Sequence, residues 1–200
     1  PRLLSSAASD VYKRQLSESS SDFIEDDISV TGGSLSSFSG SGTTYTATFT
    51  PTADSTTNGV ISVASSKFSD SAGNENADGS DSNNTLTLSV DTVRPTIAIT
   101  SGASSLKAGE TTTVTFTLSE AATDFVEDDI SVTGGLLSSF SGSGTTYTAT
   151  FTPTADSTTN GVISVASSKF SDSAGNENAD GSDSNNTLTL SVDTVRPTIA

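Results

Sequence analysis

The sequence contains no cysteine, histidine, methionine or tryptophan. Without cysteine, the chain can form neither a disulfide nor a thiolate metal site, and it has no thiol nucleophile. Without histidine, it lacks the commonest general base and the commonest transition-metal ligand. These absences remove the groups on which most enzyme active sites depend, and we expect a protein that is not an enzyme.

Basic residues are also scarce. Eight lysines and arginines stand against 24 aspartates and glutamates, which gives a formal net charge of −16. So acidic a chain is repelled by nucleic acid and by anionic membranes, and it attracts cations. No run of apolar residues approaches the roughly 18 that a membrane-spanning helix requires. We therefore expect neither nucleic-acid binding nor membrane insertion.

What the sequence does contain is a long internal repeat. The segment Asp22–Ile28 recurs as Asp124–Ile130 with one conservative change, and the offset, 124 minus 22, is 102 residues. Sliding the chain by this offset aligns residues 16–98 with 118–200, and only five of the 83 pairs differ. Self-similarity at a fixed period indicates an array of structural units.

The similarity stops abruptly upstream of Leu16. Residues 1–15 differ in character, since they hold three of the eight basic residues. Codons for residues 10–15 resemble the end of a transposon-type sequencing adaptor read in frame, so we interpret 1–15 as an artefactual, unstructured tail. The expected organisation is a first repeat at 16–94, a complete second repeat at 95–196 and the start of a third at 197–200.

Within the second repeat, apolar and polar residues alternate in short segments, as they do in strands with one buried face. Val114, Phe116 and Leu118, for example, alternate with threonines. Clusters of Gly, Ser, Asn and Asp between these segments mark turns. The pattern predicts strands at 96–100, 111–119, 125–133, 137–140, 145–152, 161–168 and 187–193. About seven short strands in about 100 residues predict an all-β, Ig-like sandwich of antiparallel strands.

The first repeat is expected to be truncated. It lacks counterparts of residues 95–117, which are the first predicted strand and most of the second. Residues 1–15 have the wrong pattern to fill this gap, so we expect a core open on one side with unpaired strand edges. We therefore expect 16–92 to be unstable alone and 95–196 to fold cooperatively.

Five motifs give the second repeat a family likeness. They are LKAGE at 106–110, VTFTLSE at 114–120, DISV at 129–132, YTATFTP at 147–153 and DSAGN at 172–176. Together they resemble the bacterial Ig-like repeats of large secreted adhesins and biofilm-type surface proteins, and by the offset the resemblance extends over both repeats. It implies a module that is extracellular or on the cell surface. Such repeats often carry calcium at or near their joints.

The acidic residues point to the same cation. If successive strands alternate in direction, the turn after the second strand, the long turn before the last strand and the linker all meet at one end of the repeat. Clustered carboxylates need a cation to offset their repulsion, and ligands that are all oxygen select calcium. The candidate ligands are Asp91, Glu120, Asp128, Asp129, Asp172, Asn176, Asn178 and Asp180. Their counterparts in the first repeat are Glu18, Asp26, Asp27, Asp70, Asn74, Asn76 and Asp78. The alternative is an ordinary solvated turn without a cation.

These features favour a stalk or spacer of an adhesin-like surface protein, with joints stiffened by calcium and with neighbouring repeats of the same chain as partners. One alternative is a glycan- or surface-binding module, although each repeat has a single tyrosine and no tryptophan to stack on a sugar. Binding to surfaces or glycans could also be carried out by domains outside this segment. A third reading is an accessory module of a larger secreted enzyme. Catalysis by Asp128 and Asp129 is disfavoured, because adjacent strand residues point to opposite faces.

Overall fold

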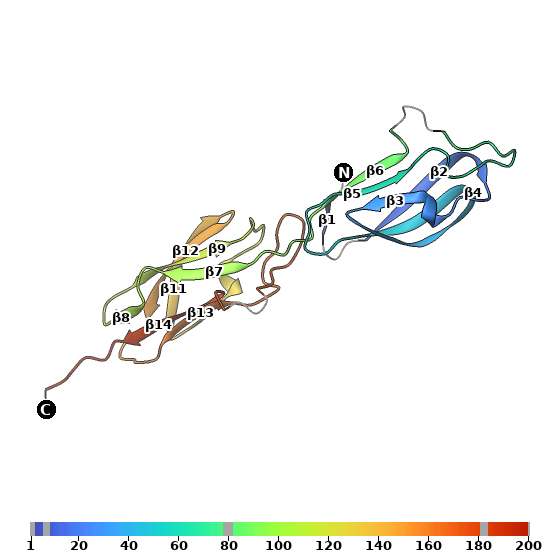
Figure 1. Ribbon diagram of the computed structural model, residues 1–200. Helices are drawn as coiled ribbons and strands as arrows, with labels where there is room; N and C mark the ends of the chain where they lie inside the picture. The colour runs from blue at the N-terminus through green and yellow to red at the C-terminus, as the bar shows by residue number, and fades with distance from the viewer. Residues whose placement is uncertain (1–2, 6–8, 78–81, 181–183, 200) are drawn as a thin grey trace. The chain divides into compact units, whose positions relative to one another are not determined.

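The computed structural model describes residues 3–5, 9–77, 82–180 and 184–199, and the chain divides into two compact units (Figure 1). Unit 1 is Pro1–Val93 and unit 2 is Arg94–Ala200, so the division falls one residue before the expected boundary. No helix in the described part of the chain is long and apolar enough to cross a membrane.

Unit 2 is a sandwich of two four-stranded sheets, with strand orders β11-β12-β9-β7 and β10-β13-β14-β8. The strands are β7 (Ile97–Ser101), β8 (Ser105–Lys107), β9 (Thr112–Leu118), β10 (Ile130–Thr133), β11 (Gly135–Ser143), β12 (Thr146–Pro153), β13 (Gly161–Val165) and β14 (Thr187–Asp193). Alternation buries Val114, Phe116 and Leu118 in a single core between the sheets. The predicted all-β, Ig-like sandwich is confirmed.

Two strands of unit 2 differ from the prediction. β8 was not expected, and it pairs parallel to β14 with Leu106 opposite Val192, so the strands are not all antiparallel. The predicted strand 125–133 is shorter, because Glu127–Asp129 form the 3-10 helix η2 before β10 begins. The Asp129 carboxylate accepts a hydrogen bond from the Val126 amide at 2.9 Å and closes this turn.

Unit 1 has the sheets β1-β6-β5-β3 and β2-β4. Its elements are β1 (Leu3–Leu4), β2 (Asp10–Ser20), the 3-10 helix η1 (Glu25–Asp27), β3 (Ile28–Thr31), β4 (Gly33–Pro51), β5 (Gly59–Val63) and β6 (Thr85–Val90). By the 102-residue offset, β4 spans the positions of both β11 and β12.

The expectation that residues 1–15 are unstructured is wrong for those that the structure describes as strands. β2 pairs with β4 in the register that β9 has with β12, and β1 pairs parallel to β6 as β8 does to β14. Leu4 and Tyr12 are buried in the positions of Leu106 and Val114. An extended segment with an apolar residue at these two inward positions is enough to occupy the place of β8 and β9.

The replacement is imperfect, and unit 1 stays open as expected. Arg14 lies opposite Tyr45, where the buried Phe116 lies opposite Tyr147 in unit 2. The Arg14 Nε and the Tyr12 hydroxyl are buried without a hydrogen-bond partner. The apolar residues form two separate clusters rather than one. No strand in the described part of unit 1 corresponds to β7, so the outer edge of β2 is uncovered.

Candidate functional site

The loop between β13 and β14 carries four of the predicted calcium ligands. All four are buried in the structure, although the sequence reads as a polar turn: Asp172, Asn176, Asn178 and Asp180 are at most 6% exposed. Buried polar groups need partners. The Asp172 carboxylate accepts hydrogen bonds from the amides of Ala174 and Asn176, at 2.8 and 2.9 Å, and from the Asn176 side-chain amide at 2.8 Å. These bonds hold Asp172 in a fixed turn.

Asn178 ties the two ends of this turn together. Its side-chain oxygen accepts hydrogen bonds from the backbone amides of Lys169 and Phe170, at 2.7 and 3.1 Å. Its side-chain nitrogen donates to the Ala166 carbonyl at 3.0 Å. The loop is therefore a built structure rather than a loose, solvated turn.

The first residues of unit 2 are fastened to the same loop. The Ile97 amide donates to the Asp180 carboxylate at 2.7 Å, and the Ala179 amide donates to the Pro95 carbonyl at 3.0 Å. The Arg94 guanidinium donates from Nε to the Glu177 carbonyl at 2.8 Å. These bonds fix where the linker enters unit 2.

Glu120 and Asp172 come from separate segments, and the structure brings them together. A carboxylate oxygen of Glu120 lies within 4.8 Å of one of Asp172. Two carboxylates this close repel each other unless a cation or a proton intervenes, and burial of Asp172 strengthens the repulsion. The pair offers two oxygen ligands to a hard cation.

Other predicted ligands do not join this pair. Asp128 and Asp129 lie in η2, where Asp129 caps the turn, and among the described residues neither belongs to a set of three carboxylates with oxygens within 4.8 Å of one another. Asp91 belongs to unit 1, where its carboxylate accepts a hydrogen bond from the Val93 amide at 3.3 Å. Its role beside unit 2 stays a prediction.

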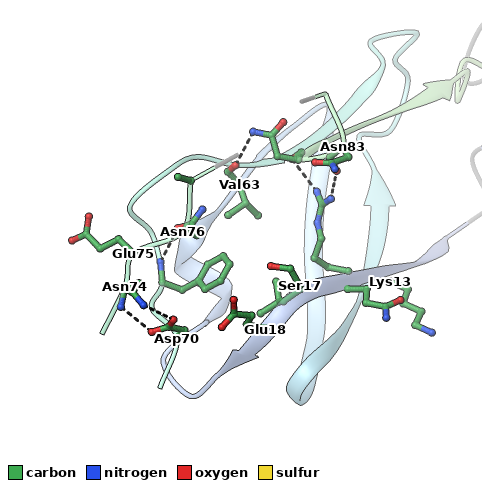
Figure 2. A pocket seen from close by; sticks show the side chains of 15 residues that line it. Lys13, Ser17, Glu18, Val63, Asp70, Asn74, Glu75, Asn76 and Asn83 are labelled. Carbon is green, nitrogen blue, oxygen red and sulfur yellow. Dashed lines mark hydrogen bonds between the residues drawn. The ribbon is translucent and has the colours of Figure 1, made fainter. Parts of the chain in front are cut away.

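The first repeat builds the same loop, but in a more exposed setting. The Asp70 carboxylate accepts hydrogen bonds from the side chain and the backbone amide of Asn74 (Figure 2). These bonds, the side-chain bond most of all, hold the pKa of Asp70 below its ordinary value. The Asn76 side chain accepts hydrogen bonds from the backbone amides of Lys67 and Phe68, just as Asn178 accepts from those of Lys169 and Phe170. Asn74 is exposed and Asp70 is half-buried.

The remaining first-repeat candidates are scattered. Glu18 is an exposed residue of β2, and Asp26 and Asp27 lie in η1, where Asp27 accepts a hydrogen bond from the Ile24 amide at 2.9 Å. Asp78 lies outside the described residues.

Sequence reasoning missed one organising carboxylate in each repeat. The Asp124 carboxylate accepts a hydrogen bond from the Ser171 amide at 2.6 Å, and that of Asp22 accepts one from the Ser69 amide at 2.9 Å. Each bond joins the turn before the 3-10 helix to the loop that carries the candidate ligands of the same unit. A hydrogen bond from the Ser20 hydroxyl, followed by the bond from Ser69, lowers the pKa of Asp22. The sequence feature that could have identified these residues is the position of each aspartate directly before a core phenylalanine, Asp124 before Phe125 and Asp22 before Phe23.

The sequence of most of the chain matches the bacterial Ig-like domain family, in one segment at residues 7–87 and another at residues 91–189. The chain belongs to the bacterial Ig-like domain family. Each of the two matched segments lies almost wholly within one of the two units. The two units are therefore bacterial Ig-like domains, and the resemblance drawn from the five motifs is confirmed.

Solved structures are similar over 96% of the chain. The adhesin FdeC of Escherichia coli is 14% identical with a TM-score of 0.50, and the chain covers 62% of its length. The adhesin InvE of Yersinia pseudotuberculosis is 12% identical with a TM-score of 0.32, and 56% of its length is covered. The likeness to FdeC concerns the fold alone. No curated protein matches the chain.

Proposed function

We propose that this chain is a non-catalytic structural module of an extracellular, adhesin-like surface protein, in which successive bacterial Ig-like domains form a stalk with joints stiffened by calcium. The observation that supports it best is the buried loop of unit 2. It holds Asp172 beside Glu120, and the first residues of the unit are hydrogen-bonded to the same loop.

Chain connectivity adds a third ligand to the proposal. Arg94 is held on the Glu177 carbonyl, and Asp91 lies three residues upstream. Three residues span at most about 11 Å even when fully extended. This short separation along the chain makes Asp91 the candidate third ligand for a cation held by Glu120 and Asp172. A cation shared by all three would link the linker to the loop.

Calcium suits this ligand set because every available donor is an oxygen. Each carboxylate has about four lone-pair positions, so Asp172 keeps capacity for a cation while it accepts its turn hydrogen bonds. Extracellular modules bind calcium with a Kd of about 10⁻⁴–10⁻³ M. At about 1 mM calcium and the tighter Kd, binding stabilises the joint by about 1.4 kcal/mol. That is enough to favour the bridged state about tenfold.

Small-angle scattering of the full chain, with calcium or with a chelator, tests the stiffening. We expect a larger maximum dimension with calcium. Glu120→Gln should remove the difference and weaken calcium binding about tenfold or more, because affinity follows the number of charged ligands. The matched control is Glu18→Gln, the same position in the first repeat, which should leave both quantities unchanged. An unchanged maximum dimension in the wild-type chain would contradict the proposal.

The distribution of aromatic rings favours the structural role over glycan binding. Tyr147, Phe125 and Phe170 are buried, and the Phe125 ring packs edge to face on Tyr147 and tilted on Phe170. The exposed large hydrophobic residues in the described part of the chain are all aliphatic. A sugar-binding face usually needs an exposed ring, so the glycan-binding alternative has no platform there.

A further inference from the structure

Two asparagines of the chain are followed directly by glycine, Asn58 by Gly59 and Asn160 by Gly161, and no other asparagine is. The two pairs differ by the 102-residue offset, so they occupy the same place in both units. Each asparagine ends a loop, and each glycine is the first residue of the strand that follows, β5 or β13. Both asparagines are exposed and both glycines are buried.

An asparagine in this position is open to a reaction within its own backbone. The nitrogen of the next residue attacks the side-chain carbonyl carbon and a C–N bond forms. The side-chain nitrogen leaves as ammonia and takes the proton that the backbone amide gives up. Water then opens the five-membered succinimide ring at one of its two carbonyls, which yields aspartate or isoaspartate. Glycine favours the attack because no side chain crowds its nitrogen.

Core packing requires the glycine of each pair. A Cβ on Gly161 would lie 2.5 Å from the Phe151 ring, and a Cβ on Gly59 would collide with the Phe49 ring in the same way. Both phenylalanines are 0% exposed, and rings in a densely packed core have no space into which to move. The residue that makes each asparagine reactive is therefore one that the sandwich cannot replace.

The side chains of Asn58 and Asn160 are available for the reaction. They make no hydrogen bond to any residue that the structure describes. Asn74, by contrast, is held by its bond to the Asp70 carboxylate (Figure 2). The attacking nitrogen belongs to the first residue of a strand, and the ends of strands open locally at little cost in free energy.

We propose that Asn58 and Asn160 are sites of self-modification, at which the folded chain converts asparagine to aspartate and isoaspartate with water as the only other reactant. Each conversion adds a negative charge, and isoaspartate also lengthens the backbone by one methylene group. The backbone at Asn160 has little room for this, because a Cβ on Gly134 would already collide with the Asn160 carbonyl oxygen. Isoaspartate therefore weakens the unit in which it forms. Neither asparagine is a candidate calcium ligand, so the inference is independent of the proposed function.

Mass spectrometry of the full chain, incubated folded or in urea at neutral pH and then digested, tests the proposal. Trypsin cuts after Lys67, Lys107 and Lys169, so residues 15–67 and 108–169 form two peptides of different sequence, each with one asparagine. Both should gain the mass difference between an amide and an acid and should separate chromatographically into aspartate and isoaspartate forms.

The rate in the folded chain should lie within about tenfold of the rate in urea, because only the first residue of a strand has to open. The peptides 68–107 and 170–200 contain the remaining asparagines and serve as internal controls, which should convert more slowly. A folded rate more than about tenfold below the rate in urea overturns the proposal. Equal conversion in the control peptides also overturns it.

Asn160→Gln removes one site, because the longer side chain would have to close a six-membered ring. The residue is exposed, so this variant still folds. Peptide 108–169 should then keep its mass, while 15–67, with the unchanged Asn58, converts as before. Conversion of 108–169 in this variant would overturn the assignment to Asn160.

Asn160→Asp separates the added charge from the lengthened backbone. Hydrogen exchange in β9 should be about tenfold faster in the incubated wild type than in this variant, because only the wild type contains isoaspartate in unit 2. An incubated wild type that exchanges no faster than Asn160→Asp overturns the proposed weakening.

Discussion

Asn178 and Asn76 provide a test of how burial sets the value of identical hydrogen bonds. Each side chain accepts from two backbone amides and donates to one carbonyl, with matching distances, and Asn178 also donates to the Asp180 carboxylate at 3.3 Å. Asn178 is 0% exposed, whereas Asn76 is half-buried. Replacing either by alanine removes the three bonds to the backbone, but water has freer access to the groups left behind in unit 1 than in unit 2.

The magnitude follows from the number of groups that lose a partner. A typical hydrogen bond contributes about 1 kcal/mol net, and a buried group left without a partner costs about 1–3 kcal/mol. We expect Asn178→Ala to lower the free energy of unfolding of unit 2 by about 3 kcal/mol or more, because three bonds to the backbone and one to Asp180 are lost around a buried side chain. Asn76→Ala should lower that of unit 1 by about 1 kcal/mol, because water replaces part of the loss.

Hydrogen exchange in increasing urea, followed on the peptides of β9 and β2, gives the unfolding free energy of each unit in the full chain. Each variant should affect only its own unit, so each unit serves as the control for the other. Equal losses in the two units would refute the reasoning, since it would mean that burial of the loop does not determine the value of its hydrogen bonds.

Two further predictions concern unit 1. Arg14→Phe should raise its free energy of unfolding by about 1–2 kcal/mol, because a ring takes the place that the buried Phe116 has in unit 2 and removes an Nε that is buried without a partner, which outweighs the lost bonds to the Asn83 and Asn84 carbonyls. Urea denaturation measures this, and an unchanged or lower stability would contradict it. Because hydrogen bonds from Asn74 lower the pKa of Asp70 in the folded state, they stabilise unit 1 above the ordinary pKa of 3.8, and this stability is lost as the pH falls through the lowered pKa. Asp70→Asn should flatten the pH dependence of unit 1 unfolding below about pH 4, and an identical profile in the variant would show that Asp70 does not contribute.

Much of the fold was predictable because the buried face of a strand leaves a period of two in the sequence. β9 and β12 follow that pattern closely, with Val114 and Phe151 as inward positions. β8 was not predictable in this way, since three residues with one buried leucine give no period. The 3-10 helix η2 was missed because it depends on one side-chain hydrogen bond, from the Val126 amide to Asp129, rather than on an apolar pattern.

The sequence did not predict that residues 10–15 form part of β2, for a different reason. Lys13 and Arg14 look unsuitable for a sandwich strand, but the register is set by backbone hydrogen bonds to β4, which any extended segment can supply. The instability expected of residues 16–92 alone stays a prediction.

The candidate site was predictable to the level of segments but not of side chains. Strand direction placed Glu120 and Asp172 at the same end, and the structure brings their carboxylates together. The same argument included Asp128 and Asp129, because topology says where a turn lies and not which way its side chains point. It overlooked Asp124, whose contact with Ser171 depends on the detailed course of two loops.

The way in which β2 stands in for β9 has an evolutionary consequence. Because residues 16–93 accept an unrelated sequence as their edge strand, a recombination break inside one repeat need not leave an unusable half-domain. The segment that takes the place of the missing strands needs little more than apolar residues at two inward positions, as Leu4 and Tyr12 provide, and it costs the unit a divided core. A cut inside a repeat therefore lowers the quality of the sandwich without abolishing its pairing.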